Sequence, residues 1–189
     1  MASTITQEDN LILQSYYTVL LLKELGEENF EESSTFDNLN LLTEIKKSLK
    51  DIKIQNQGSA IMALYAMLVV PKEIIEHEFK SEYQRIEDFL KNEVTVHNTT
   101  YKSEDISNYQ TIKFVSHARN SVAHAKVSFD PNISVTFNDQ RVTKKKGGLE
   151  NVEKISFSLP LTKFGEFLNS LQNVHLSYIQ KRINSQSSS

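Results

Sequence analysis

The stretch HARNSVAHAKV, residues 117–127, concentrates chemically active side chains more than any other part of the chain. Two histidines, an arginine, an asparagine and a serine lie here among small apolar residues, in place of the many Lys and Glu of an ordinary solvent-exposed helix face. Ser103 is a plausible N-cap for the helix that leads into this stretch. Apolar residues then recur at helical spacing and predict a buried stripe, made of Ile106, Tyr109, Ile112, Val115, Ala118 and Val122.

Helix geometry limits how these side chains can act together. His117, Ser121 and His124 lie at i, i+4 and i+7 and share one face. The two histidines are about 10 Å apart along the axis, so this helix alone is not expected to bind a metal ion. Arg119 and His124 are about 140° apart around a regular helix and do not converge on one atom. Either the helix frays near His124, or two copies of it meet about a twofold axis.

The remaining chain reads as helices before this segment and strands after it. Apolar spacing predicts helices over residues 9–25, 37–54, 60–70 and 72–94. The polar stretches 26–35 and 95–101 are expected to be a loop and a linker. After Ala125 the apolar period changes to two, which predicts short strands at residues 126–129, 133–137 and 154–159. An amphipathic helix should then run from residue 162 to about residue 181.

These elements predict a single, mainly α domain over residues 1–182, followed by a disordered tail at 183–189. The expected fold class is a bundle of five or six helices, with a small antiparallel β-sheet inserted after the helix that carries the distinctive segment. The length of 189 residues, with 5 Gly and 3 Pro, is consistent with one core built from long helices.

Composition and charge exclude several classes of protein. The chain has no cysteine, which excludes disulfides, thiolate catalysis and Cys-based zinc sites. Its net charge of -3 is not the basic excess of a protein that grips duplex nucleic acid along its length, so any such contact must be local. The apolar run 60–70 is too short to span a bilayer, and the start of the chain has no secretory signal. We therefore expect a cytoplasmic protein without membrane contact.

Familiar catalytic motifs are absent from the sequence. It contains no Gly-rich phosphate loop, no Gly-x-Ser-x-Gly elbow and no His-Glu-x-x-His pair. Acidic residues are scattered, without the clustering that a two-metal nuclease needs. We expect neither a metal site nor a cofactor.

The segment RNSVAH, residues 119–124, resembles the Arg-x4-His motif of HEPN domains, including the polar Asn directly after the Arg. An apolar helix ending in Pro (residues 59–73), a long helix, the motif, a short sheet and an amphipathic helix follow an order similar to the plasmid- and defence-associated branch of bacterial HEPN proteins. The likeness covers about residues 9–179, although only the motif itself is specific.

The resemblance implies a helical bundle that dimerises and a metal-independent endoribonuclease, of the kind found in toxin–antitoxin, abortive-infection and CRISPR-linked systems. Matched by position, Arg119, Asn120 and His124 would be the catalytic set. His117 and Ser121 lie nearby as auxiliary candidates, and the role of His117 is not inherited from the motif. The implied partners are a second copy of the chain, an RNA substrate, and an antitoxin or other regulatory protein.

The chemistry suits these residue types. A 2′-hydroxyl of RNA can attack the neighbouring phosphorus and leave a 2′,3′-cyclic phosphate. A His with a pKa of about 6.5 can transfer the protons. A permanently charged Arg can bind the non-bridging oxygens as charge develops there, while Asn orients the His or holds the phosphate.

Simpler interpretations remain open for each candidate. Arg119 and His124 could cap the last carbonyls of a helix, and a HEPN fold could serve as a non-catalytic dimeric interaction or RNA-binding module. His117 is more often a satisfied histidine than a catalytic one. A basic loop could steer RNA or could be only a soluble hairpin connection; it contains Arg141, Lys144, Lys145 and Lys146.

Overall fold

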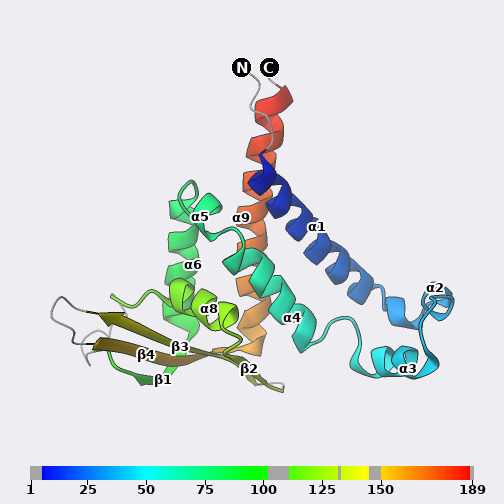
Figure 1. The fold of residues 1–189 in the computed structure, drawn as a ribbon, viewed down its shortest axis with the longest axis horizontal. Coiled ribbons are helices and arrows are strands. Elements are labelled where there is room, and N and C mark those ends of the chain that lie inside the picture. Colours follow the sequence, from blue (N-terminus) through cyan, green and yellow to red (C-terminus); the bar gives the residue numbers. More distant parts are fainter. Residues whose placement is uncertain (1–5, 102–110, 132, 145–149, 188–189) are drawn as a thin grey trace.

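The computed structural model describes residues 6–101, 111–131, 133–144 and 150–187 (Figure 1). Its helical elements are α1 (Gln7–Glu27), the short 3-10 helix η1 (Phe30–Glu32), α2 (Ser34–Asp37), α3 (Thr43–Ile52), α4 (Gln57–Leu64), the π-helical turn η2 (Tyr65–Val69), α5 (Lys72–Ile75), α6 (Lys80–Glu93), α8 (Phe114–Ala123) and α9 (Leu161–Ser187). Its strands are β1 (Thr95–Thr99), β2 (Val127–Asp130), β3 (Ser134–Lys144) and β4 (Glu150–Pro160). The expected fold class, mainly α with a small antiparallel sheet, is confirmed.

The sheet has the order β1-β4-β3-β2, and every neighbouring pair is antiparallel. Strands β2, β3 and β4 follow α8, as expected, but β1 precedes it. The interpretation of residues 95–101 as a linker was therefore wrong for Thr95–Thr99, which pair with Ser158 to Ile155 of β4. This polar segment becomes a strand because it adds to the edge of a sheet formed by residues far along the chain.

One face of the sheet carries the hydrophobic core. The helices α6, α8 and α9 lie on this face (Figure 1). Phe137 of β3 pairs with Phe157 of β4, and their rings stack at a centroid distance of 5.2 Å. Phe114, the first residue of α8, meets the Phe157 ring edge-on at 5.0 Å. All three side chains are fully buried, so aromatic packing sets the start of α8 directly on the sheet.

Two expected helices are interrupted in the structure. The helix predicted over residues 72–94 divides into α5 and α6, with a break at residues 76–79. The helix predicted over residues 37–54 is shorter than expected: it corresponds to α3, which begins at Thr43, while Asp37 is the last residue of α2. Conversely, α9 continues to Ser187, so residues 183–187, expected in a disordered tail, are helical. Apolar spacing thus indicated helices in these regions but did not locate their breaks and ends.

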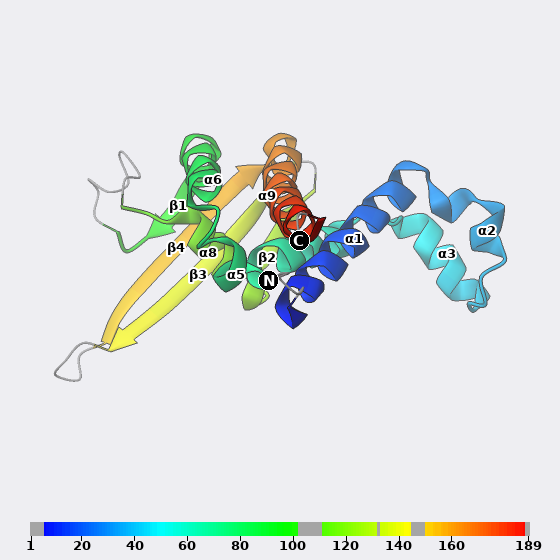
Figure 2. The ribbon, with the colours of Figure 1, turned by 90° about the horizontal axis from the view of Figure 1, so that it is seen from above.

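The helices α2 and α3 project away from the body of the molecule (Figure 2). No residue of α3 is buried, and even Ile45 and Ile52 on its apolar side are 43% and 56% exposed. None of the helices in the described part of the chain is both long and apolar enough to cross a membrane.

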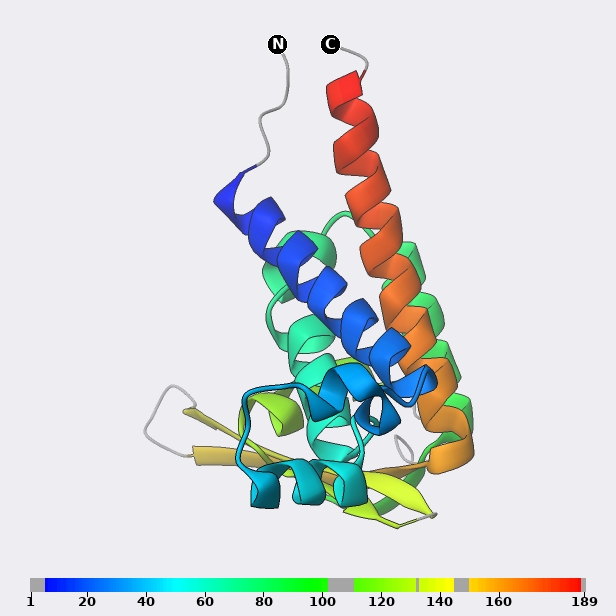
Figure 3. The same cartoon turned by 90° about the vertical axis from the view of Figure 1, so that its right-hand side faces the viewer.

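The helices α1 and α9 pack together, and the start of α1 lies beside the end of α9 (Figure 3). Asp9 accepts hydrogen bonds there from the Tyr178 hydroxyl and from Arg182 Nε. Burial alone would raise the pKa of Asp9. The opposing effect is larger, because the carboxylate accepts hydrogen bonds from Tyr178 and Thr6 and lies near the Arg182 charge, so its pKa falls below the ordinary value. The ionised carboxylate thus joins the two chain ends.

Candidate functional site

The helix α8 begins at a carboxylate supplied by another helix. Its N-cap residue, Lys113, makes no side-chain capping bond. Glu87 of α6 supplies the capping acceptors instead: Phe114 N–H donates to Glu87 Oε1 at 2.7 Å, and Val115 N–H donates to Oε2 at 3.0 Å. A buried carboxylate at a helix N-terminus satisfies unpaired N–H groups and favourably meets the positive end of the helix dipole. Glu87 therefore fixes α8 against α6.

The helix ends one residue before His124, which is the C-cap. Lys126 N–H donates to Ser121 O at 2.7 Å and Ala125 N–H donates to Val122 O at 3.1 Å, the paired bonds of a Schellman motif. Ala125 adopts a left-handed conformation with φ 52°, which costs a non-glycine residue roughly 1 kcal/mol. The chain thus departs from the helix at His124, whose side chain is exposed, in agreement with the first of the two arrangements left open by the sequence.

Asp139 of β3 holds the middle of the motif. Its Oδ2 atom lies 2.7 Å from His117 Nδ1 and accepts a hydrogen bond of 3.1 Å from Asn120 Nδ2. Asn120 Oδ1 in turn accepts a hydrogen bond of 2.8 Å from Arg119 Nη2. Asp139 is 6% exposed, and charge-assisted bonds of this kind are the stronger ones in proteins. The chain Asp139–Asn120–Arg119 restrains the guanidinium from inside the fold.

His117 is buried and has a partner on each ring nitrogen. Its Nε2 atom lies 2.8 Å from the hydroxyl of Tyr101, which follows β1, and the two rings meet edge-on. One ring nitrogen is thus paired with the Asp139 carboxylate and the other with the Tyr101 hydroxyl. Ser121 is fully buried and donates to His117 O at 2.8 Å. Both auxiliary candidates thus lie inside the fold, while Arg119 and His124 reach its surface.

The expected basic loop is described only in part. Arg141 is exposed and lies on the same face of β3 as Asp139, two residues further along. Lys144 is the last residue of β3. Lys145 and Lys146 lie outside the described residues, so their steering role stays a prediction. Within the described ranges no group of three His, Asp or Glu side chains is arranged to hold a metal ion.

Sequence reasoning missed Asp139, Glu87 and Tyr101. For Asp139 a signal was present, because it continues the inward positions Val135 and Phe137 of a strand whose neighbours are polar. A carboxylate at such a position must be paired when it is buried. Glu87 and Tyr101 carried no local signal, because their partners lie 27 and 16 residues away.

Comparison with known proteins assigns the chain to a family. The model of the family described as HEPN pEK499 p136 matches residues 9–182. No curated protein and no solved structure matches the chain significantly. The matched region contains the whole α8 helix, its terminal motif and the sheet that supplies Asp139. Since this match covers nearly the entire sequence, the chain belongs to the HEPN family.

Proposed function

We propose that this protein is a metal-independent endoribonuclease that cleaves RNA at a homodimer interface, in a toxin–antitoxin or phage-defence setting. One observation carries the proposal: in a HEPN chain, the Arg-x4-His segment ends α8 with Arg119 restrained through Asn120 and Asp139 and with His124 exposed just beyond the helix. A fixed cation beside an accessible imidazole is what a phosphodiester needs for acid–base cleavage.

In the proposed reaction the RNA 2′-oxygen attacks the adjacent phosphorus. The bond between the 2′-oxygen and phosphorus forms, the bond to the 5′-oxygen breaks, and the products are a 2′,3′-cyclic phosphate and a 5′-hydroxyl. One His124 accepts the proton of the 2′-hydroxyl, and a second His124 donates a proton to the leaving 5′-oxygen. The guanidinium of Arg119 stabilises the negative charge on the non-bridging oxygens.

Two histidines require two chains, because each chain contributes one His124. HEPN domains typically dimerise, and a twofold interface places the same segment of each chain next to its symmetry mate. The end of α8 suits such a contact, because Ala123 and His124 are exposed there and the small Ala123 side chain permits close approach. Asp139 acts in this scheme as a positioning residue, which orients Asn120 and through it Arg119.

The test combines cleavage with oligomeric state. Purified protein is incubated with mixed single-stranded RNA in EDTA, and the products are analysed by mass spectrometry for 2′,3′-cyclic phosphate ends. Arg119→Ala and His124→Ala should each reduce the rate by about 100-fold or more. The matched control Arg85→Ala removes an exposed arginine from α6 and should cleave like the unmodified protein.

Two results would contradict the proposal. Cleavage that persists in both motif variants would show that another site does the chemistry. A monomer at all concentrations, measured by light scattering, would remove the second histidine that the reaction needs. A stable dimer that cleaves none of a broad set of RNAs would favour the other candidate, a non-catalytic HEPN interaction module.

A further inference from the structure

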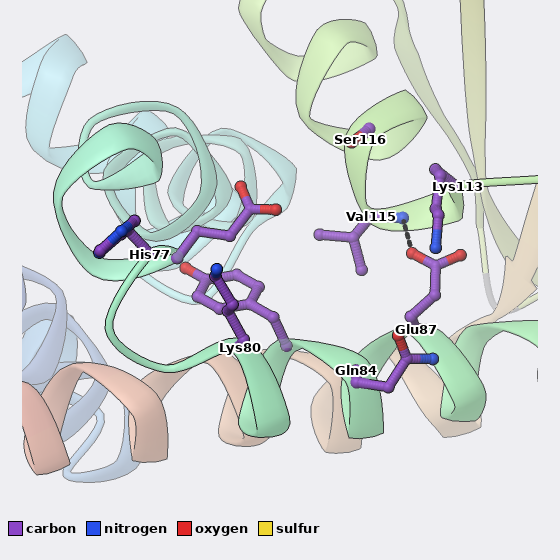
Figure 4. A pocket seen from close by; sticks show the side chains of 9 residues that line it. His77, Lys80, Gln84, Glu87, Lys113, Val115 and Ser116 are labelled. Atoms are coloured by element: carbon purple, nitrogen blue, oxygen red, sulfur yellow. Dashed lines mark hydrogen bonds between the residues drawn. The ribbon is translucent and has the colours of Figure 1, made fainter.

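A groove of about 560 Å³ runs between α6 and α8 (Figure 4). Lys80, Gln84 and Glu87 lie along α6 on one side, and Lys113, Val115 and Ser116 lie on the α8 side, opposite them. His77, from the break between α5 and α6, stands at one end. We call this the α6–α8 groove. Its volume lies within the range of small-ligand sites in proteins.

The α6–α8 groove leads toward the motif. A small crevice lined by Arg119 and Leu68 shares walls with the groove, because both are lined by Glu76, Tyr83, Val115 and Ser116. Arg119 follows Ser116 by one helical turn and therefore stands on the same side of α8. A ligand in the groove would thus lie beside the guanidinium that the proposed reaction uses.

Tyr83 is the strongest indication that the groove has a ligand. Its side chain is 8% exposed, and its hydroxyl makes no hydrogen bond to any described residue. A buried hydroxyl without a partner costs free energy that folding does not recover. Burial raises the pKa of Tyr83 above its ordinary value, with a smaller contribution from Glu76, so the hydroxyl keeps its proton. It is therefore a hydrogen-bond donor without an acceptor among the described residues. Less than 1 Å² of its oxygen is exposed, so a ligand in the groove reaches it by displacing the side chains that cover it.

The charges of the groove suit one nucleotide better than a long polyanion. Lys80 and Lys113 are exposed on opposite walls, and each adds a positive charge that attracts phosphate. Glu87 is already occupied by the N–H groups of α8. Glu76 remains as an acceptor for the amino group of a base, and Gln84 can both donate and accept.

We propose that the α6–α8 groove binds the nucleotide of single-stranded RNA that adjoins the phosphodiester held by Arg119. Lys80 and Lys113 bind its phosphate, and the Tyr83 hydroxyl donates a hydrogen bond to its base or sugar. This inference rests on the proposed ribonuclease function and extends it, since it assigns to each protomer its own substrate-binding surface outside the motif.

Binding can be measured separately from cleavage. The probe is a fluorescein-labelled 2′-O-methyl RNA of roughly 12 nucleotides, which has no free 2′-hydroxyl and cannot be cut by the proposed reaction. Fluorescence anisotropy of the full chain gives the dissociation constant at several salt concentrations. Lys80→Gln and Lys113→Gln should each weaken binding about threefold to tenfold and reduce the salt slope by about 0.7. Lys47→Gln, an exposed lysine on α3, is the matched control and should change neither.

Tyr83→Phe is the sharpest variant because it removes only the hydroxyl. It should weaken binding of the probe by about fivefold. Since that hydroxyl has no partner in the described part of the fold, the melting temperature should stay the same or rise. Weaker binding with unchanged or higher stability would support the groove as the binding surface.

The inference is overturned if Tyr83→Phe and both lysine variants bind the probe like the unmodified protein, or if Lys47→Gln weakens binding as much as they do. It is also overturned if the unmodified protein does not bind the probe. These outcomes are distinct from failure of the proposed function: a protein that binds through the groove but never cleaves RNA would keep the groove and lose the nuclease.

Discussion

Asp139 Oδ2 and His117 Nδ1 lie 2.7 Å apart, although β3 and α8 bring these residues from positions 22 apart in the sequence. The same oxygen accepts the Asn120 amide at 3.1 Å. One buried carboxylate thus joins the sheet to the motif at two points along α8. The orientation of the second motif residue is therefore set by the sheet as well as by its own helix.

Removing the acceptor should affect both stability and activity. Asp139→Ala removes the acceptor of the buried His117 and of the half-buried Asn120, so the free energy of unfolding should fall by about 2–4 kcal/mol. RNA cleavage measured well below the melting temperature should fall by about tenfold, because Arg119 loses its restraint. Urea denaturation and single-turnover cleavage measure the two effects.

Two companion variants separate positioning from general damage. Asp139→Asn keeps a carbonyl oxygen without the charge and should lie between the unmodified protein and Asp139→Ala in both assays. Gln140→Ala, on the exposed face of the same strand, should change neither. If Asp139→Ala stays folded and cleaves at the full rate, the positioning role is refuted.

The cap of α8 predicts a second effect. Glu87→Gln replaces one of the two acceptor oxygens with an NH₂ group, which cannot accept from the backbone N–H groups of Phe114 and Val115. The free energy of unfolding should fall by about 1–2 kcal/mol. Asp88→Asn makes the same charge change at an exposed neighbour and should shift it by less than about 0.5 kcal/mol. Equal melting temperatures for the two variants would argue against the cap.

Opposite effects are expected from the same substitution on either side of His124. Ala125→Gly relieves the left-handed conformation with φ 52° and should raise the free energy of unfolding by about 0.5–1 kcal/mol. Ala123→Gly lies in the last turn of α8 and should lower it by about 0.5–1 kcal/mol. Thermal melts of both variants compare the signs, and a loss of stability in Ala125→Gly would show that the turn is not strained.

His175 predicts a loss of stability in acid. Burial lowers the pKa of His175 below the ordinary 6.5 in the folded chain, against a smaller opposing effect of its bond to Leu171 O. As the pH falls below about 6.5, the unfolded chain therefore takes up this proton first, and the free energy of unfolding decreases until the pH reaches the folded-state pKa.

The matching experiment compares His175→Leu with the exposed-site control His77→Gln. Urea denaturation between pH 7.5 and pH 5, a range of roughly one pH unit or more on either side of the ordinary histidine value, gives the slope for each. His175→Leu should lose part of the acid destabilisation, while His77→Gln should keep it. An unchanged slope in His175→Leu would assign the effect to other groups.

The sequence predicted the fold class and the family-defining segment because both depend on local patterns. Apolar spacing identified α1, α9 and the late strands, and RNSVAH is contiguous, so one reading of the chain reveals it. The sequence pattern did not predict the break between α5 and α6, nor did it assign Thr95–Thr99 to a strand. Both features depend on packing against distant elements, which propensity and spacing do not encode.

By itself, then, the sequence determined the mainly α fold class, the late strands and which short segment carries the Arg and His of a HEPN chain. Only the tertiary structure decided the surroundings of that segment. It placed Asp139 beneath Asn120, Glu87 at the start of α8, and Tyr83 beside the adjoining groove, with a buried hydroxyl that has no partner among the described residues. The physical reason is that burial and hydrogen-bond pairing between distant residues arise only when α6 and α8 pack together and against the sheet.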